Sequence, residues 1–203
     1  MTLRLHRIPF STNVERVEIA LGLKGVPFEY VDHDPADRAS IRALSGQDLV
    51  PVVELDGEVL ADSPAILRWI DEQWPDPPLW PAEPARRAET DTFIDWFNLV
   101  WKGPPNEIDA LLGDPEPDTR RIAQLEAELT GSLERFEALL DRRDFLLGDE
   151  LGAADVTAWP FLRYAQGCPP GDEERFHRIL AEHLSPPGPR LDAWIDRVGE
   201  VVG

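Results

Sequence analysis

The chain has 203 residues, of which 42% are hydrophobic and 29% are charged, and this composition supplies a packed core and excludes a disordered chain. Twenty basic residues against 39 acidic ones give a net charge of −19, so we expect neither nucleic acid nor an anionic membrane as a partner, because both are held by basic surfaces. The length favours two compact domains of about 80 and 120 residues.

The first part of the chain alternates strand and helix patterns. Apolar and polar residues alternate over 3–8, which predicts a strand that Pro9 ends, and a 3.6-residue apolar period predicts a helix over 14–24. The turn Asp56-Gly57 predicts a hairpin between 52–55 and 58–60. Further strands are expected over 28–31 and 50–55, and further helices over 36–44 and 64–73. This order predicts an α/β sheet of thioredoxin-like type with an antiparallel edge.

Prolines mark the domain boundary. Five of them stand in the segment from Trp74 to Pro84, where neither helix nor strand can continue. We therefore expect a thioredoxin-like domain over 1–76, a proline-rich linker over 77–84 and a second domain over 85–203. No strand pattern recurs after the linker, and helices are expected over 85–101, 119–140, 153–166, 172–183 and 190–201. The second domain is predicted to be all α.

Several kinds of chemistry are not expected. No apolar stretch approaches the length of a membrane-spanning helix, and we expect a cytoplasmic protein. The single cysteine, Cys168, leaves no partner for an internal disulfide or a Cys-x-x-Cys pair, and we interpret it as a bystander. The four histidines are scattered without the spacing of metal ligands, so we expect no metal.

A short polar segment follows the first predicted strand. Ser11, Thr12 and Asn13 lie between that strand and the next helix, where open α/β sheets place ligands. All three residue types are preferred helix caps, so one of them could serve only to satisfy backbone amides. A hydroxyl at a helix N-terminus can equally donate to an anion. Both interpretations stay open from the residues alone.

Two further segments could take part in binding. Pro51 begins a strong strand, and if its peptide bond is cis rather than trans, the backbone of Val50 is exposed to pair with an extended peptide. Asp62-Ser63-Pro64 has the pattern of a helix start, with Asp62 or Ser63 as the cap. The same amides and hydroxyl could receive a ligand carboxylate while Asp62 takes an ammonium group.

The order and spacing of these segments resemble the glutathione transferase family, in particular its phi-like and theta-like serine classes of bacterial type. Residues 11–17 resemble the stretch from the family's catalytic serine into the first helix, and Val50-Pro51 is similar to its cis-proline dipeptide. Residues 62–66 resemble its acid-Ser-x-Ala-Ile motif. In the second domain, 145–149 and 152–156 are similar to the segment before and within the family's buried helix.

The resemblance implies a glutathione transferase that conjugates or reduces small electrophilic substrates, with glutathione as co-substrate and no metal. It implies that Ser11 stabilises the glutathione thiolate rather than acting as a nucleophile. The residues that it implies for glutathione binding are Asn13, Leu49, Val50, Pro51, Asp62 and Ser63. It also implies a cytoplasmic homodimer with a role in detoxification. The alternative is a non-catalytic thiol-binding or protein-interaction member of the same fold.

The chain departs from the family pattern at several positions. Leu49 stands where a glutamine often binds the ligand backbone, and Arg38 and Arg42 are the candidates for the glycyl carboxylate. Gly152 replaces the usual Ser or Thr cap, so Asp155 at the third helical position must work with a glycine. By the scale of helix caps, this replacement costs only a few tenths of a kcal/mol.

An aromatic stripe begins the second domain. It has helical spacing and consists of Phe93, Trp96, Phe97, Val100 and Trp101. Such a stripe is by default core. Because the corresponding helix of the family lines the electrophile pocket, Trp96 and Trp101 are also candidates for the wall of that pocket.

Overall fold

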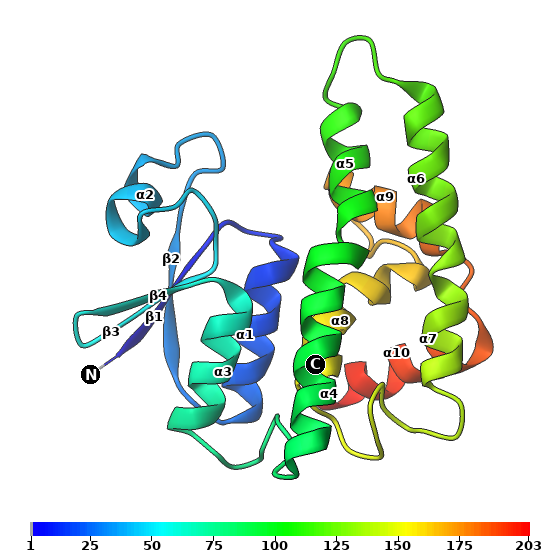
Figure 1. The fold of residues 1–203 in the computed structure, drawn as a ribbon. Helices are drawn as coiled ribbons and strands as arrows, with labels where there is room; N and C mark the ends of the chain where they lie inside the picture. The colour runs from blue at the N-terminus through cyan, green and yellow to red at the C-terminus, as the bar shows by residue number, and fades with distance from the viewer. Residues whose placement is uncertain (1) are drawn as a thin grey trace. The chain divides into compact units, whose positions relative to one another are not determined.

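The computed structural model describes residues 2–203, whose contacts divide the chain between Trp80 and Pro81. The unit before this division is an α/β domain and the unit after it is helical (Figure 1). This confirms the predicted fold class. The division lies inside the segment 77–84 that the sequence predicts as a linker, while the limits given for each domain stay predictions.

The first unit contains a four-stranded sheet with three helices. Its elements are β1 (Leu3–Arg7), α1 (Thr12–Leu23), β2 (Phe28–Asp32), α2 (Ala39–Ser45), β3 (Val52–Leu55), β4 (Glu58–Ala61) and α3 (Ser63–Gln73). The strand order is β2-β1-β3-β4, with β1 parallel to β2 and the other pairs antiparallel. β3 begins two residues later than expected, at Val52, because Pro51 has no amide hydrogen for the ladder.

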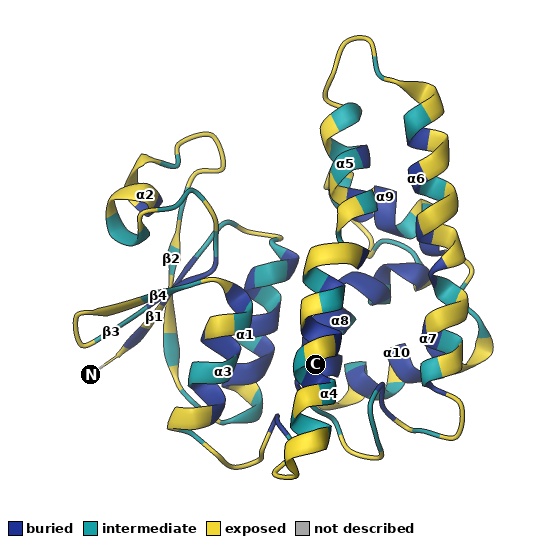
Figure 2. Ribbon diagram, viewed as in Figure 1, coloured by how far each residue is buried: buried dark blue, intermediate teal, exposed yellow. Residues whose placement is uncertain are grey.

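The core of this unit lies between the sheet and two helices. α1 and α3 pack side by side on one face of the sheet, and α2 lies on the other side (Figure 1). The buried faces of these helices are dark blue in Figure 2. They include Val14, Val17, Leu21, Ile66, Leu67 and Ile70, and Leu5 and Val53 of the sheet are buried as well. The apolar period of each helix therefore faces the sheet, as its sequence predicts.

A buried ion pair fixes the end of the first unit. The ammonium group of Lys24 lies 2.7 Å from the Asp71 carboxylate, and both side chains are shielded from water. The same carboxylate accepts hydrogen bonds from the backbone amides of Leu79 at 2.7 Å and Trp80 at 3.3 Å. The first half of the proline-rich linker, residues 77–80, is therefore packed onto the first unit.

The second unit is built from helices. They are α4 (Pro84–Trp96), a π-helical turn (Phe97–Trp101), α5 (Gly103–Leu111), α6 (Thr119–Gly131), α7 (Leu133–Leu139), α8 (Ala153–Leu162), a 3-10 turn (Arg163–Gln166), α9 (Arg175–Leu184) and α10 (Pro189–Val202). The sequence did not predict α5, because its first turn contains Gly103, Pro104 and Pro105. Proline is tolerated there, since the first helical amides have no partner within the helix.

α8 forms the centre of the second unit and is buried along nearly its whole length (Figure 2). Its Asp155 is 1% exposed and accepts hydrogen bonds from the backbone amides of Leu146 at 2.9 Å and Gly152 at 3.0 Å. The indole N–H of Trp194 donates to the same carboxylate at 2.8 Å. Asp155 thus works with a glycine cap, as expected, and also joins α8 to α10.

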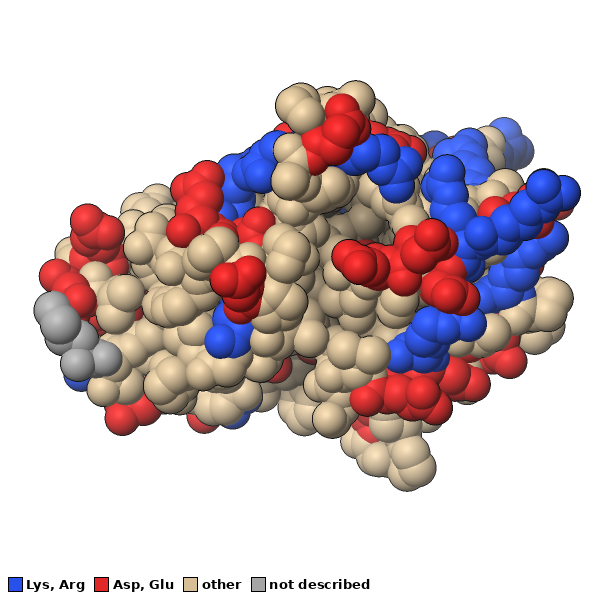
Figure 3. Space-filling model, turned by 90° about the horizontal axis from the view of Figure 1, so that it is seen from below, with Lys and Arg blue, Asp and Glu red and all other residues tan. Residues whose placement is uncertain are grey.

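The surface carries opposite charges side by side, as Figure 3 shows for one face. Arg121 bonds Glu107 at 2.6 Å, and Arg175 bonds Asp109 at 2.6 Å. Many basic groups are therefore neutralised locally despite the acidic total. Among residues 2–203, no helix has both the length and the apolar character needed to cross a bilayer.

Candidate functional site

Strand pairing brings the three predicted ligand segments to one edge of the sheet. His6 is opposite Val52, so the carboxyl end of β1 lies beside the start of β3. Val52 is also opposite Ala61, so Pro51 and Asp62 adjoin each other at the same edge. The loops that carry Ser11, Val50 and Asp62 therefore meet there, as expected for a ligand site at the carboxyl end of a strand.

Ser11 occupies the N-cap position of α1, but its hydroxyl does not cap the helix. Its backbone carbonyl accepts from the amides of Val14 and Glu15 at 2.9 and 3.0 Å, whereas its side chain makes no capping hydrogen bond to the described residues. Other helices of this chain are capped by side chains. The carboxylates of Glu83 and Asp118 each accept two amides at the starts of α4 and α6. Helix capping therefore does not account for the presence of a hydroxyl side chain at position 11.

Two residues at this edge have a positive φ angle, which is uncommon for residues other than glycine. Phe10, directly before Ser11, has φ of 66°, and Asp62, directly before α3, has φ of 77°. The Asp62 side chain is exposed and makes no capping bond among residues 2–203. Strained backbone of this kind clusters at functional sites, where the surrounding structure holds it in place.

Residues 49–51, directly before β3, form part of this edge of the sheet with their backbone and their side chains. The Val50–Pro51 peptide bond is cis, which decides the alternative that the sequence left open. Val50 is half-buried and Pro51 is buried, whereas Leu49 is 66% exposed. Leu49 offers a ligand only its apolar side chain and its backbone, in place of the amide side chain common in the family.

Arg16 connects α1 and α3 and was not among the predicted site residues. Its side chain is completely buried, and its Nη1 donates to Asn13 Oδ1 at 3.0 Å and to Ser63 Oγ at 3.2 Å. Burial lowers the pKa of Arg16 to about 9, while the charge of Asp62 acts in the opposite direction. The guanidinium therefore stays charged at neutral pH. Two predicted binding residues, Asn13 and Ser63, thus share one buried cation.

The two arginines considered for a second ligand carboxylate bond to their own loop. Arg42 makes a bidentate ion pair with Asp48 at 2.6 and 2.5 Å, which lowers the pKa of that carboxyl. Arg38 donates to the backbone carbonyls of Pro35 and Asp48. These contacts fix the connection between α2 and β3, and they occupy the groups that would have to turn to a ligand.

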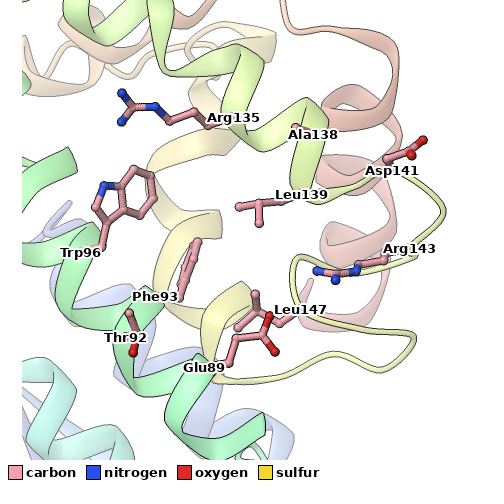
Figure 4. A pocket seen from close by; sticks show the side chains of 10 residues that line it. All are labelled: Glu89, Thr92, Phe93, Trp96, Arg135, Ala138, Leu139, Asp141, Arg143 and Leu147. Atoms are coloured by element: carbon pink, nitrogen blue, oxygen red, sulfur yellow. The ribbon is translucent and has the colours of Figure 1, made fainter. Parts of the chain in front are cut away.

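Trp96 lines a pocket within the second unit. The pocket has a volume of about 720 Å³, and its walls come from α4, from α7 and from the segment after α7 (Figure 4). Phe93, Trp96 and Leu139 supply apolar walls, while Arg135 and Asp141 stand among the charged residues that line it. This volume is in the range of pockets that hold small organic molecules.

Trp101, the other expected pocket residue, lies in the core instead. It is 3% exposed and stacks on Phe97 at a centroid distance of 4.3 Å. Its indole N–H donates to the hydroxyl of Ser132 at 2.9 Å, so both its ring and its polar group are fully used inside the unit. The stripe is therefore divided between core and pocket wall.

The remaining candidates add no chemistry to this site. Cys168 is partly buried, and burial raises the pKa of its thiol, which keeps it protonated at neutral pH. Within the described part of the chain, no three residues of the types that bind metals gather as a possible metal site.

Family models match both units of the chain. Residues 5–78 match the N-terminal domain of glutathione S-transferase, and residues 120–197 match its C-terminal domain. The chain is 30% identical to the glutathione S-transferase GstB of Escherichia coli K12, over 75% of this chain and 77% of that protein.

Two further relatives extend over almost the whole chain. The maleylacetoacetate isomerase of Pseudomonas aeruginosa PAO1 is 30% identical, over 98% of this chain and 90% of that protein. Among solved structures, a theta class glutathione S-transferase from Xanthomonas axonopodis pv. citri with glutathione bound is 26% identical. That structure aligns with a TM-score of 0.75 over 97% of this chain and 92% of its own.

Proposed function

Because the chain belongs to the glutathione S-transferase family, we propose that it catalyses the addition of the glutathione thiolate to small electrophilic molecules. The observation that carries this proposal is the hydroxyl of Ser11, which stands at the start of α1 without a capping role. The relatives above include a transferase and an isomerase. Activation of a glutathione thiol is the chemistry that we propose for this chain in either kind of reaction.

In the proposed mechanism, Ser11 donates its hydroxyl hydrogen to the sulfur of glutathione. The N-terminus of α1 adds a favourable field for negative charge at this place. Together the two effects favour the thiolate, which is the reactive form of a thiol. Ser11 itself forms no bond to the substrate, since a thiolate is a better nucleophile than a hydroxyl.

The rest of glutathione would lie along the sheet edge. The backbone of Val50 would pair with the cysteinyl backbone of the ligand, in the manner of an added strand. The Ser63 hydroxyl and the N-terminus of α3 would receive the carboxylate of the γ-glutamyl group. Asp62 would accept its ammonium group. Asn13, Leu49 and Pro51 would complete the walls of this site.

The first prediction concerns Asp62. Replacing Asp62 by alanine should weaken glutathione binding by about 1.5 to 3 kcal/mol, the range for a hydrogen bond to a charged group. Isothermal titration calorimetry measures this loss directly. Asp56→Ala is a matched control, because Asp56 is also exposed and has a positive φ angle, but it lies in the hairpin turn between β3 and β4. Equal affinities of Asp62→Ala and wild-type protein would refute the role of Asp62.

The electrophile is proposed to be small and hydrophobic and to contact Trp96. Support comes from the partial exposure of this indole and from the size of the pocket that it lines. Assays with glutathione and either an aryl halide or maleylacetoacetate test the two kinds of reaction that the relatives' names suggest. Binding of glutathione without turnover of either compound would instead favour a non-catalytic thiol-binding protein.

Location in the cytoplasm and a role in detoxification remain predictions from the resemblance.

The second prediction is that the protein forms a homodimer. Leu99 and Val100 are 80% and 56% exposed on the π-helical turn that follows α4. Exposed apolar side chains of this kind suit a closed two-fold contact, which would cover them in both copies. Light scattering should give about 46 kDa, twice the 22.9 kDa chain mass. A mass of one chain at micromolar concentration would contradict the dimer.

A further inference from the structure

The acidic residues that line the pocket beside Trp96 are already paired with cations from outside its lining. Glu89 lies 2.7 Å from Arg86. Asp141 lies 2.8 Å from Arg190, and Figure 4 shows the Asp141 side chain directed away from the cavity. Both negative charges of the pocket are therefore neutralised by arginines that do not line it.

The two arginines that line the same pocket have no acidic partner. Throughout residues 2–203, no carboxylate forms an ion pair with the guanidinium of Arg135 or Arg143. Arg143 donates to the backbone carbonyl of Leu146 at 3.4 Å. Arg135 is exposed on α7 and extends toward the indole of Trp96 (Figure 4). The pocket is therefore locally positive although the chain carries a net charge of −19, and a locally positive pocket favours an anion.

Apolar side chains complete the walls of the pocket between these charges. Phe93 is 7% exposed, and its ring centroid lies 5.7 Å from that of Trp96. Leu139 points into the cavity from α7 (Figure 4). The volume of about 720 Å³ accommodates a substituted aromatic ring. A planar guanidinium can donate two parallel hydrogen bonds to a carboxylate. The pocket thus combines a surface for an aromatic ring with a cation for an acidic substituent.

We propose that this pocket selects electrophiles that carry a carboxylate on an aromatic ring, with the ring against Phe93 and Trp96 and the carboxylate on Arg135. The inference rests on the proposed function, in which the electrophile contacts Trp96. With an aryl chloride of this class, the thiolate sulfur forms a bond to the ring carbon that carries chlorine. Chloride leaves with the electron pair of the broken bond, and the carboxylate is unchanged. Arg135 binds the carboxylate and takes no part in the bond changes.

The first test measures binding without any reaction. The compounds 3,5-dinitrobenzoate and 3,5-dinitrobenzamide share one ring and carry no halogen, and only the benzoate is an anion at neutral pH. Isothermal titration calorimetry on the full-length wild-type protein should show binding of the benzoate about five-fold tighter or more, as expected for an exposed charge-assisted hydrogen bond. In Arg135→Met this preference should fall to about two-fold or less. Arg135→Lys should retain part of it, because an ammonium group keeps the charge without the fork of the guanidinium.

Two further variants test where the compounds bind. Arg142 is exposed in the same segment as Arg143 but does not line the pocket, so Arg142→Met should keep the full preference. Trp96→Ala removes the contact with the ring and should weaken both compounds by a similar factor. Equal affinities of wild-type protein for the two compounds would overturn the proposal. It would also be overturned if Arg135→Met kept the wild-type preference, if Arg142→Met lost as much of it as Arg135→Met, or if Trp96→Ala bound both compounds as tightly as wild-type protein.

Turnover with glutathione separates this inference from the proposed function. The compounds 4-chloro-3,5-dinitrobenzoate and 4-chloro-3,5-dinitrobenzamide are compared by kcat/KM. Each value is divided by the rate with glutathione alone, because the two substituents activate the ring to different degrees. Wild-type protein should favour the benzoate, and Arg135→Met should lose this preference through KM with little change in kcat.

The two ways of failing are distinguishable. Turnover of the benzamide without a preference for the benzoate would overturn the inference and leave the proposed function standing. Binding of 3,5-dinitrobenzoate that depends on Arg135, with no turnover of either chloro compound, would refute the proposed function, while the selectivity of the pocket for anions would hold.

Discussion

Replacing Ser11 by alanine should reduce turnover near pH 7 by about 10- to 100-fold while leaving the fold and most of the affinity for glutathione intact. A free cysteinyl thiol has a pKa near 8.5, so only a few per cent is thiolate at neutral pH. A hydrogen bond from Ser11 and the N-terminus of α1 would together favour the thiolate by about 1 to 3 kcal/mol, which corresponds to about one to two pKa units.

The turnover of Ser11→Ala and of wild-type protein should depend on pH in different ways. Without the hydroxyl, the pKa of the bound thiol should rise toward that of the free thiol. The variant should therefore recover part of its activity as the pH rises, whereas wild-type turnover should already have levelled off. A rate profile from about pH 6 to pH 9 with a generic electrophile measures both effects.

Ser11→Thr and Thr12→Val are suitable controls. Threonine at position 11 keeps a hydroxyl and should retain much of the activity. The Thr12 side chain is 5% exposed, and Thr12→Val preserves its shape, so this variant should turn over like wild-type protein. If Ser11→Ala keeps the wild-type rate and an unchanged pH profile, the Ser11 hydroxyl has no role in thiol activation.

The sequence predicts the elements around the candidate site well because their signals are local. Pro9 ends a strand, Asp56-Gly57 forms a hairpin and Pro64 opens a helix, and each of these effects acts within a few residues. The hairpin signal also predicts that β3 pairs with β4, whereas the pairing of β1 with β3 joins strands that are not consecutive in the chain and was not predicted. The resemblance to the family adds the residues of the three loops, which the register of β1, β3 and β4 brings to one edge.

Features that depend on distant contacts were not predicted. Arginine in an amphipathic helix usually faces solvent, whereas Arg16 is completely buried, and one acceptor of its guanidinium, Ser63, lies 47 positions later. Trp101 lies in the core, which was the default for its stripe, but the acceptor of its indole N–H, Ser132, lies 31 positions later and was not predicted. In both cases the helical period alone does not determine the partner, and therefore does not determine which way the side chain faces.

Replacing Asp155 by alanine should have the largest effect on stability, a loss of about 4 kcal/mol in the free energy of unfolding. The substitution removes the acceptor of three N–H groups, from Leu146, Gly152 and Trp194. A buried donor left without a partner costs about 1 to 3 kcal/mol, and these costs are not fully additive. The total is a large fraction of the stability of a typical domain, which is about 5 to 15 kcal/mol.

Urea unfolding followed by circular dichroism measures this loss, and two variants calibrate it. Asp149→Ala removes a carboxylate from the exposed part of the same loop and should change stability by less than about 0.5 kcal/mol. Asp155→Asn keeps one acceptor oxygen and should lose about half as much as Asp155→Ala. A stability of Asp155→Ala within error of that of Asp149→Ala would show that the three donors find other partners.

The pH dependence of unfolding tests the same carboxyl independently. Burial raises the pKa of Asp155 in the folded protein, against the N–H groups that donate to it. The folded state then binds a proton more tightly than the unfolded chain, so the contribution of this group is fully present below the unfolded pKa of about 4. It is lost as the pH rises through the raised pKa. In Asp155→Asn this decrease should be absent, because the amide does not titrate. Identical pH profiles for wild-type protein and Asp155→Asn would mean that the pKa of Asp155 is the same in the folded and unfolded states.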